Sequence, residues 1–171
     1  MHPMKGMLTL ALLACGLATP ARAEVSEVIL GQQFGAVYLV NMVMESEKLV
    51  EKNLAAAGLK DVKVTWAKLG GPAALNDAML SGNLHFASQG VPSLAVIWDR
   101  TRGNIGVKAL GSVANNNIWL NTKNPNLKSL KDYTEKDRIA VPSLKVSTQA
   151  LLLQFAAEQT FGKGQFAKLD H

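Results

Sequence analysis

The sequence predicts an α/β fold built around a parallel sheet. Between residues 28 and 148 the chain repeats one arrangement, in which an apolar strand-like run is followed by a small polar loop and a helix-like stretch. Five such loops, which consist mainly of glycine, amide and hydroxyl residues with almost no charge, lie at residues 31–35, 70–72, 88–93, 115–117 and 142–148. Three β-α units in succession favour a parallel, right-handed, doubly wound sheet.

Residues 1–23 have the pattern of a cleaved secretory signal peptide. A weakly charged start with His2 and Lys5 precedes a short apolar stretch, and Ala21-Arg22-Ala23 offers the small residues that an export peptidase recognises. The apolar stretch is about half the length that a bilayer requires, which argues against a transmembrane anchor. We therefore expect a periplasmic protein whose mature chain begins at Glu24.

Cys15 leaves a second processing route open. Leu12-Leu13-Ala14-Cys15 loosely resembles a lipoprotein box, in which the cysteine is acylated and becomes the first mature residue. Cleavage after Ala23 would instead leave no cysteine, so disulfides and thiol redox chemistry would be excluded.

The composition of the mature chain limits its partners and its size. Loss of Lys5 and Arg22 takes 18 basic residues to 16, against 13 acidic ones. This surplus is spread along the chain, and we expect no nucleic-acid binding because phosphate contacts need clustered cations. The length suffices for one ordinary domain with a substantial core, but not for two complete lobes.

The first strands and helices are placed by their apolar patterns. Residues 25–30 form a short β-branched run that is typical of a buried central strand. Residues 37–57 follow with helical periodicity, and Gly58 ends that helix. Residues 62–66 alternate as the second strand, because three apolar side chains there share one face.

Prolines mark where the next helices begin. Pro72 opens a short helix, since proline suits the first helical turn, and Gly82 is expected to end it. Residues 84–87 form the third strand. A third helix follows Pro92 over residues 93–100, and two more strands are expected at residues 108–113 and 118–120.

The pattern changes after residue 121. A turn at Asn124-Pro125 and a short surface helix at residues 127–132 precede a new strand at 138–141 and an apolar helix at 147–161. These elements divide the chain into a signal peptide (1–23), a first α/β lobe (24–121), a crossover linker (122–137) and an incomplete second α/β lobe (138–171).

Several segments together point to a known family. They are the export signal, the loop Gly31–Gly35 before a long helix, Gly70-Gly71-Pro72 before residues 78–82, the run 84–88, and Val141-Pro142-Ser143. Their order resembles the periplasmic substrate-binding proteins of ABC importers, in the nitrate/sulfonate/taurine-type group that includes thiamine-precursor-binding relatives. The resemblance implies a type II periplasmic-binding-protein-like fold, with ligand between two lobes that close by hinge motion. It breaks off early in the second lobe, so we expect a truncated chain.

The resemblance also implies a function. The chain would bind a small anionic or polar organic solute, such as a sulfonate, taurine or nitrate, and deliver it to an ABC permease in the inner membrane. Alternatives are binding of a thiamine-precursor pyrimidine, a synthase-like enzyme of the same fold, and a sensory binding lobe.

Catalytic chemistry finds little support in the residues themselves. His85 is the sole interior histidine, and no second histidine, cysteine or paired carboxylate is placed to form a metal site or a triad. We therefore expect no enzyme, no cofactor and no metal. We also expect a monomer.

The candidate ligand-binding residues of the first lobe lie in its polar loops. Gln33 and Phe34 follow the first strand, where Phe34 either stacks on a planar ligand group or packs under the next helix. Gly70 and Gly71 either present N–H groups to an anion at a helix start or only form a tight turn. Gln89 is expected to have its amide free for a ligand.

The remaining candidates lie near helix starts and in the second lobe. The Ser93 hydroxyl either contacts ligand or caps its own helix. Asn117, in the run of three asparagines, either donates its amide or only helps to make a turn. Lys145 is the one cation in the five loops, and it is either the counter-charge for an anion or a solvated lysine. The same loop contains three further candidate ligand-binding residues, Ser143, Ser147 and Thr148.

Overall fold

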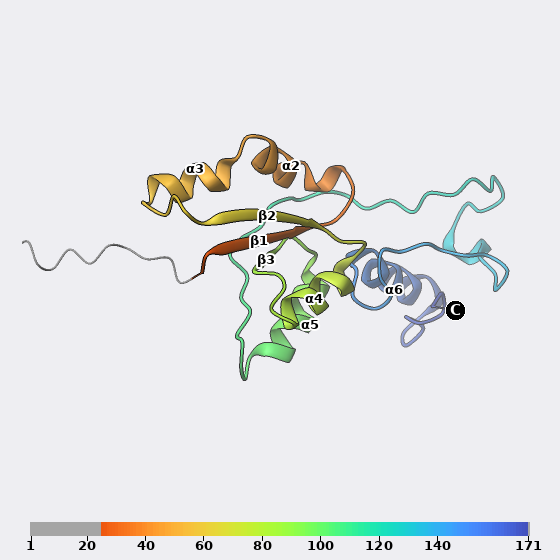
Figure 1. The fold of residues 1–171 in the computed structure, drawn as a ribbon. Coiled ribbons are helices and arrows are strands. Elements are labelled where there is room, and N and C mark those ends of the chain that lie inside the picture. Colours follow the sequence, from red (N-terminus) through yellow and green to blue (C-terminus); the bar gives the residue numbers. More distant parts are fainter. Residues whose placement is uncertain (1–24, 171) are drawn as a thin grey trace, which may run out of the picture.

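A three-stranded parallel sheet lies at the centre of the fold, with helices on both of its faces (Figure 1). The computed structural model describes residues 25–170, so the expected signal peptide and Cys15 lie outside the described residues. The expected α/β class is confirmed. Among residues 25–170, no helix combines the length and the apolar character needed to cross a bilayer.

The sheet has the strand order β2-β1-β3. The central strand β1 (Glu27–Gln32) pairs along its whole length with β2 (Lys63–Lys68). On its other side it pairs with β3 (Phe86–Ala87) over two residues only. Because the chain adds β2 on one side of β1 and β3 on the other, right-handed connections must place their helices on opposite faces of the sheet.

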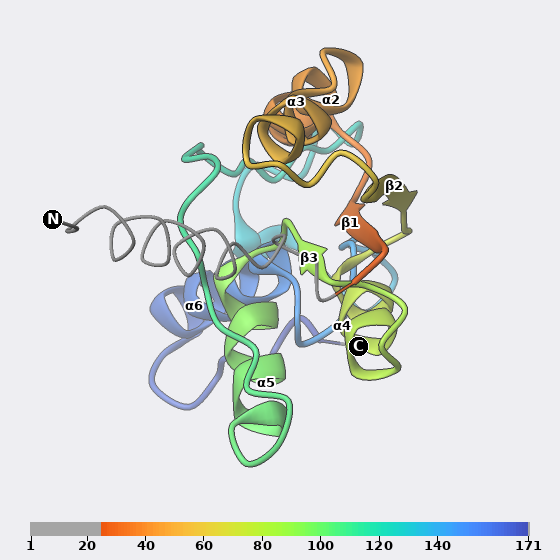
Figure 2. The ribbon, with the colours of Figure 1, turned by 60° about the vertical axis from the view of Figure 1, so that its left-hand side comes forward.

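The helices follow this rule. Helices α2 (Leu39–Ser46) and α3 (Leu49–Ala56) lie on one face of the sheet. Helices α4 (Pro72–Leu80) and α5 (Val91–Thr101) lie on the other (Figure 2). The start of α4 at Pro72 is as predicted, because proline fits the first helical turn.

The expectation of one helix over residues 37–57 is wrong. A 3₁₀ turn, η2 (Ala36–Tyr38), precedes α2, and the chain breaks again between α2 and α3. Lys48 causes this second break, because its backbone is left-handed with φ of 51° and cannot continue a right-handed helix. Gly58, with φ of 84°, follows the end of α3 as expected.

Helix α5 begins earlier than predicted, at Val91, with Gly90 as its N-cap. Pro92 therefore lies inside the first turn, where its missing N–H costs nothing. Ser93 also lies inside this turn, so its expected role as the N-cap is wrong.

The apolar core is small and lies under the α4 and α5 face of the sheet. Leu75 of α4, Leu84 and Ile97 of α5 are its buried side chains there. Gly31 of β1 faces the first two: a Cβ at this position would lie 2.6 Å from one methyl carbon of each. The absence of a side chain at Gly31 therefore lets β1 and α4 approach closely.

The strands predicted at residues 108–113, 118–120 and 138–141 do not form. Between α5 and α6 (Thr148–Phe161) the described chain has only the 3₁₀ turn η3 (Leu130–Asp132), which replaces the surface helix expected at 127–132. A strand needs a hydrogen-bonded neighbour, and none of these segments has one. The first two also run exposed: Leu110 is 83% exposed and Trp119 is 76% exposed. The apolar patterns of the three segments are those of strands, but the described chain gives them no partner.

Gly31→Ala is expected to lower the free energy of unfolding by about 1–3 kcal/mol, because the added methyl group overpacks the contact with Leu75 and Leu84. Urea denaturation measures this. Gly103→Ala is the matched control, since a Cβ there meets nothing within 4 Å. Equal stability of the two variants would contradict the close approach of β1 and α4.

Candidate functional site

The three strands end at one edge of the sheet because they are parallel. We call the loops at this edge, residues 33–35, 69–71 and 88–90, the carboxyl edge. Helices α4 and α5 begin there. In open α/β sheets, ligands bind outside the carboxyl ends of the strands where the strand order reverses, which in this sheet is between β1 and β3.

A hydrogen bond spans this reversal point. Asn41 of α2 donates from Nδ2 to Oγ of Ser88 over 2.8 Å, and the same hydroxyl lies 3.2 Å from Asn41 Oδ1. Asn41 is almost fully buried, so the contact fixes α2 to the loop after β3. We did not predict a role for Asn41. Its amide among the apolar residues of α2 was the available signal.

Gln32, the last residue of β1, forms a second polar cluster on the α2 face. Its Nε2 donates to Oε2 of Glu45 over 2.9 Å, and the same oxygen pairs with Lys68 Nζ at 3.3 Å. Gln32 is fully buried, and its Oε1 has no hydrogen-bond partner among the described residues. Such an acceptor is costly to leave unpaired, so this end of β1 would accept an N–H or O–H donor.

The next two residues, Gln33 and Phe34, lie at the carboxyl edge as predicted. The side-chain amide of Gln33 forms no hydrogen bond with any other described residue. Phe34 is 69% exposed, so the alternative in which its ring packs under the following helix is wrong. Phe34 is therefore open to a ligand, whereas Gln33 is buried, with 9% of its surface exposed.

Gln89 and Ser93 are occupied inside the protein. Gln89 Nε2 donates to Oδ1 of Asn76 over 3.0 Å, and its Oε1 accepts from the Ser93 hydroxyl over 2.8 Å. Asn76 Nδ2 in turn donates to the Ser93 carbonyl over 3.2 Å. The expectation that Gln89 has a free amide is wrong. The three residues instead hold α4 and α5 together.

Residues 142–148 lie directly on the helix starts at the carboxyl edge. A Cβ on Gly71 would lie 2.7 Å from the Pro142 carbonyl oxygen and 2.8 Å from Oγ of Ser143. A Cβ on Gly90 would overlap Oγ1 of Thr148. Glycine at these two positions therefore makes room for the second part of the chain, a role that we did not predict.

Not every candidate glycine or asparagine takes part. A Cβ on Gly70 would meet nothing within 4 Å, so this glycine is not needed for the contact. Asn117 is exposed in the long segment before α6, where the neighbouring Asn116 donates to its carbonyl over 3.2 Å. The structure has no turn at residues 115–117, so the turn interpretation of Asn117 is wrong.

The candidates near α6 divide into one structural residue and one open cation. Ser147 is the N-cap of α6: it accepts from the Ala150 N–H over 3.2 Å and donates to the Ser143 carbonyl over 2.7 Å. Lys145 is exposed in a left-handed turn with φ of 63°, and it forms none of the three ion pairs found among residues 25–170.

The structure thus brings together residues of four of the five predicted loops. Among the described residues 25–170, no group of three or more His, Cys, Asp or Glu side chains is placed to hold a metal ion. The groups left open at the edge are neutral or cationic, which suits hydrogen bonding to a polar or anionic molecule. In comparisons with known proteins, no protein family, curated protein or solved structure matches the chain.

Gly71→Ala is expected to lower the free energy of unfolding by about 2 kcal/mol, because the methyl group would meet a backbone carbonyl that cannot rotate away. Gly70→Ala is the matched control one residue earlier, where the space is open. Thermal and urea unfolding compare the two. A Gly71→Ala variant as stable as Gly70→Ala would show that residues 142–143 do not rest on the start of α4.

Proposed function

We propose that this chain is a solute-binding protein. It holds a small anionic or polar organic solute at the carboxyl edge and delivers it to a membrane permease outside the cytoplasm. The observation that carries the proposal is the convergence of neutral polar loops from both halves of the chain on one edge of a parallel sheet. This is the position at which open α/β sheets bind ligands.

The groups left open at this edge fit such a solute. Lys145 offers an exposed ammonium group and Phe34 an exposed aromatic ring, and the buried Gln33 adds an amide without an internal partner. Amide and ammonium donors bind the oxygens of a sulfonate, carboxylate or nitrate, and a ring covers an apolar or planar part of the same molecule.

Proton transfer has no equivalent support at the edge. The carboxylate of Glu45 is paired with Lys68 and Gln32. His85, the interior histidine, accepts the Ile29 N–H at Nδ1 over 3.0 Å and so completes the pairing of β1 beyond the short β3. Both side chains therefore serve the sheet, which favours binding over turnover.

Residues 142–148 cover the starts of α4 and α5, so this contact determines the route by which a solute enters. Gly71 and Gly90 leave no gap for a molecule between these parts of the chain. Solute binding therefore requires this contact to open, as in a hinge between two rigid parts. A solute that prefers the opened or remodelled arrangement shifts the population toward it.

A screen of sulfonates, taurine, nitrate, bicarbonate and pyrimidine precursors by thermal unfolding tests the proposal. At 100 times its Kd, a true ligand adds about 2.7 kcal/mol of stability and raises Tm. Phe34→Ala should leave the ligand-free Tm within about 1 °C of the parent value and reduce the ligand-induced shift, because its ring is 69% exposed.

Gln89→Ala provides the contrasting variant. Its amide bonds Asn76 and Ser93, so its removal should lower ligand-free stability by about 1–3 kcal/mol and spare the ligand-induced shift. The absence of a shift with every solute of the panel would count against the proposal. Turnover of any of these solutes would contradict it.

A further inference from the structure

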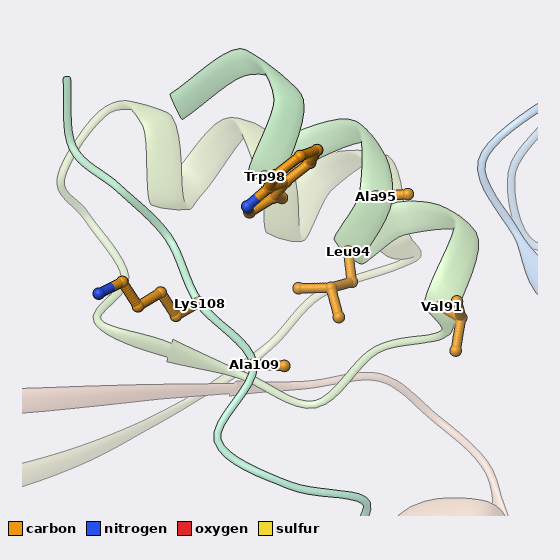
Figure 3. Close-up of a pocket in the computed structure, with 6 residues that line it drawn as sticks. All are labelled: Val91, Leu94, Ala95, Trp98, Lys108 and Ala109. Carbon is orange, nitrogen blue, oxygen red and sulfur yellow. The ribbon is translucent and has the colours of Figure 1, made fainter. Parts of the chain in front are cut away.

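A hollow lies along α5 and begins at Val91, the residue that follows the carboxyl edge. It has a volume of about 370 Å³ and lies between α5 and the start of the extended segment that follows it (Figure 3). This volume is within the range of sites for small molecules. Its lining residues are Val91, Leu94, Ala95, Trp98, Lys108 and Ala109.

The lining of this hollow is apolar on one side and polar on the other. Leu94 and Val91 project from α5 beside Ala109 of the facing segment. The nitrogen end of the Trp98 ring points into the space between Leu94 and Lys108 (Figure 3). An indole N–H is a donor only, so this side of the hollow offers donors and no acidic group.

One cation, Arg102, lies beside the Trp98 ring, and a second, Lys108, lines the hollow with its ammonium group pointing away from Leu94 in Figure 3. Lys108 is exposed and takes part in none of the ion pairs formed among residues 25–170. The Arg102 guanidinium lies 5.5 Å from the centre of the Trp98 ring, and it is paired with Asp99 at 3.1 Å. Arg102 therefore stabilises the position of the Trp98 ring by a cation–π contact. The Lys108 ammonium group has no acidic partner among the described residues and can pair with an anion.

We propose that this hollow binds a small amphipathic anion, namely a monocarboxylate with a flat apolar body. The apolar body lies against Leu94, Val91 and the Trp98 face. The carboxylate lies at the Lys108 side, where it accepts from the indole N–H and where the exposed Lys108 side chain turns its ammonium group toward it. Uncharged apolar molecules lack the second interaction, and highly charged solutes gain nothing from the apolar wall. The proposal stands independently of the site at the carboxyl edge.

Titration of the full chain with 1-naphthoate, followed by ¹H–¹⁵N NMR of the tryptophan indole groups, tests the proposal. The Trp98 signal, identified by its loss in Trp98→Phe, should shift in a saturable way while the signals of Trp66 and Trp119 stay in place. Lys108→Gln should weaken 1-naphthoate binding about 5-fold, as expected for a partly exposed ion pair. The neutral isostere 1-naphthamide should bind both proteins with equal affinity.

Lys60→Gln is the matched control, because Lys60 is an exposed lysine in the turn before β2. It should leave 1-naphthoate affinity unchanged. The proposal is overturned if 1-naphthoate produces no saturable shift, if it shifts Trp119 as strongly as Trp98, or if Lys108→Gln binds it as tightly as Lys60→Gln does. Trp119 is the more exposed of these two rings, so it reports non-specific adsorption.

Discussion

The docking of residues 142–148 on the first turns of α4 and α5 is the contact on which the rest of the structure depends. It is possible because Gly71 and Gly90 have no side chains to block the approach. The same segment leads into α6 through the N-cap Ser147, so it places that helix against the first part of the chain. Helix α6 also contacts α5 directly, and the two contacts together join α6 to the first part of the chain.

The carboxyl edge is held by neutral hydrogen bonds. Asn41 fixes α2 to the loop after β3, and Gln89 fixes α5 to Asn76 of α4. Fully paired buried polar groups rigidify their surroundings, and they cost stability only when a partner is lost. The edge is therefore a rigid frame that exposes Lys145, and a solute reaches the rest of it when residues 142–148 move off the helix starts.

Much of the first half could be predicted from the sequence, and much of the second half could not. The strands β1 and β2 and the helix starting at Pro72 follow local rules of apolar pattern and proline placement. The strands expected at residues 108–113 and 138–141 satisfied the same rules. A strand also requires a neighbour, however, and that depends on distant parts of the chain.

The site shows the same limit. That Gln33 and Gly71 lie at one edge follows from the parallel order of the strands. That Gln89 is internally bonded depends on where α4 places Asn76, which no local pattern reveals. Likewise, Lys48 has a left-handed backbone and interrupts a helix whose apolar pattern is continuous. Glycine is the residue that usually marks a left-handed position, so no residue type at this point predicts the break.

The contact between Gly90 and Thr148 allows the central claim to be measured directly. A double-mutant cycle of Gly90→Ala and Thr148→Ala, followed by urea unfolding, gives their coupling energy. If Thr148 lies on Gly90, the methyl group of Gly90→Ala should cost about 1–3 kcal/mol in the parent and at least about 1 kcal/mol less once the threonine hydroxyl is removed. Additive effects within about 0.3 kcal/mol would contradict the docking of residues 142–148 on the carboxyl edge.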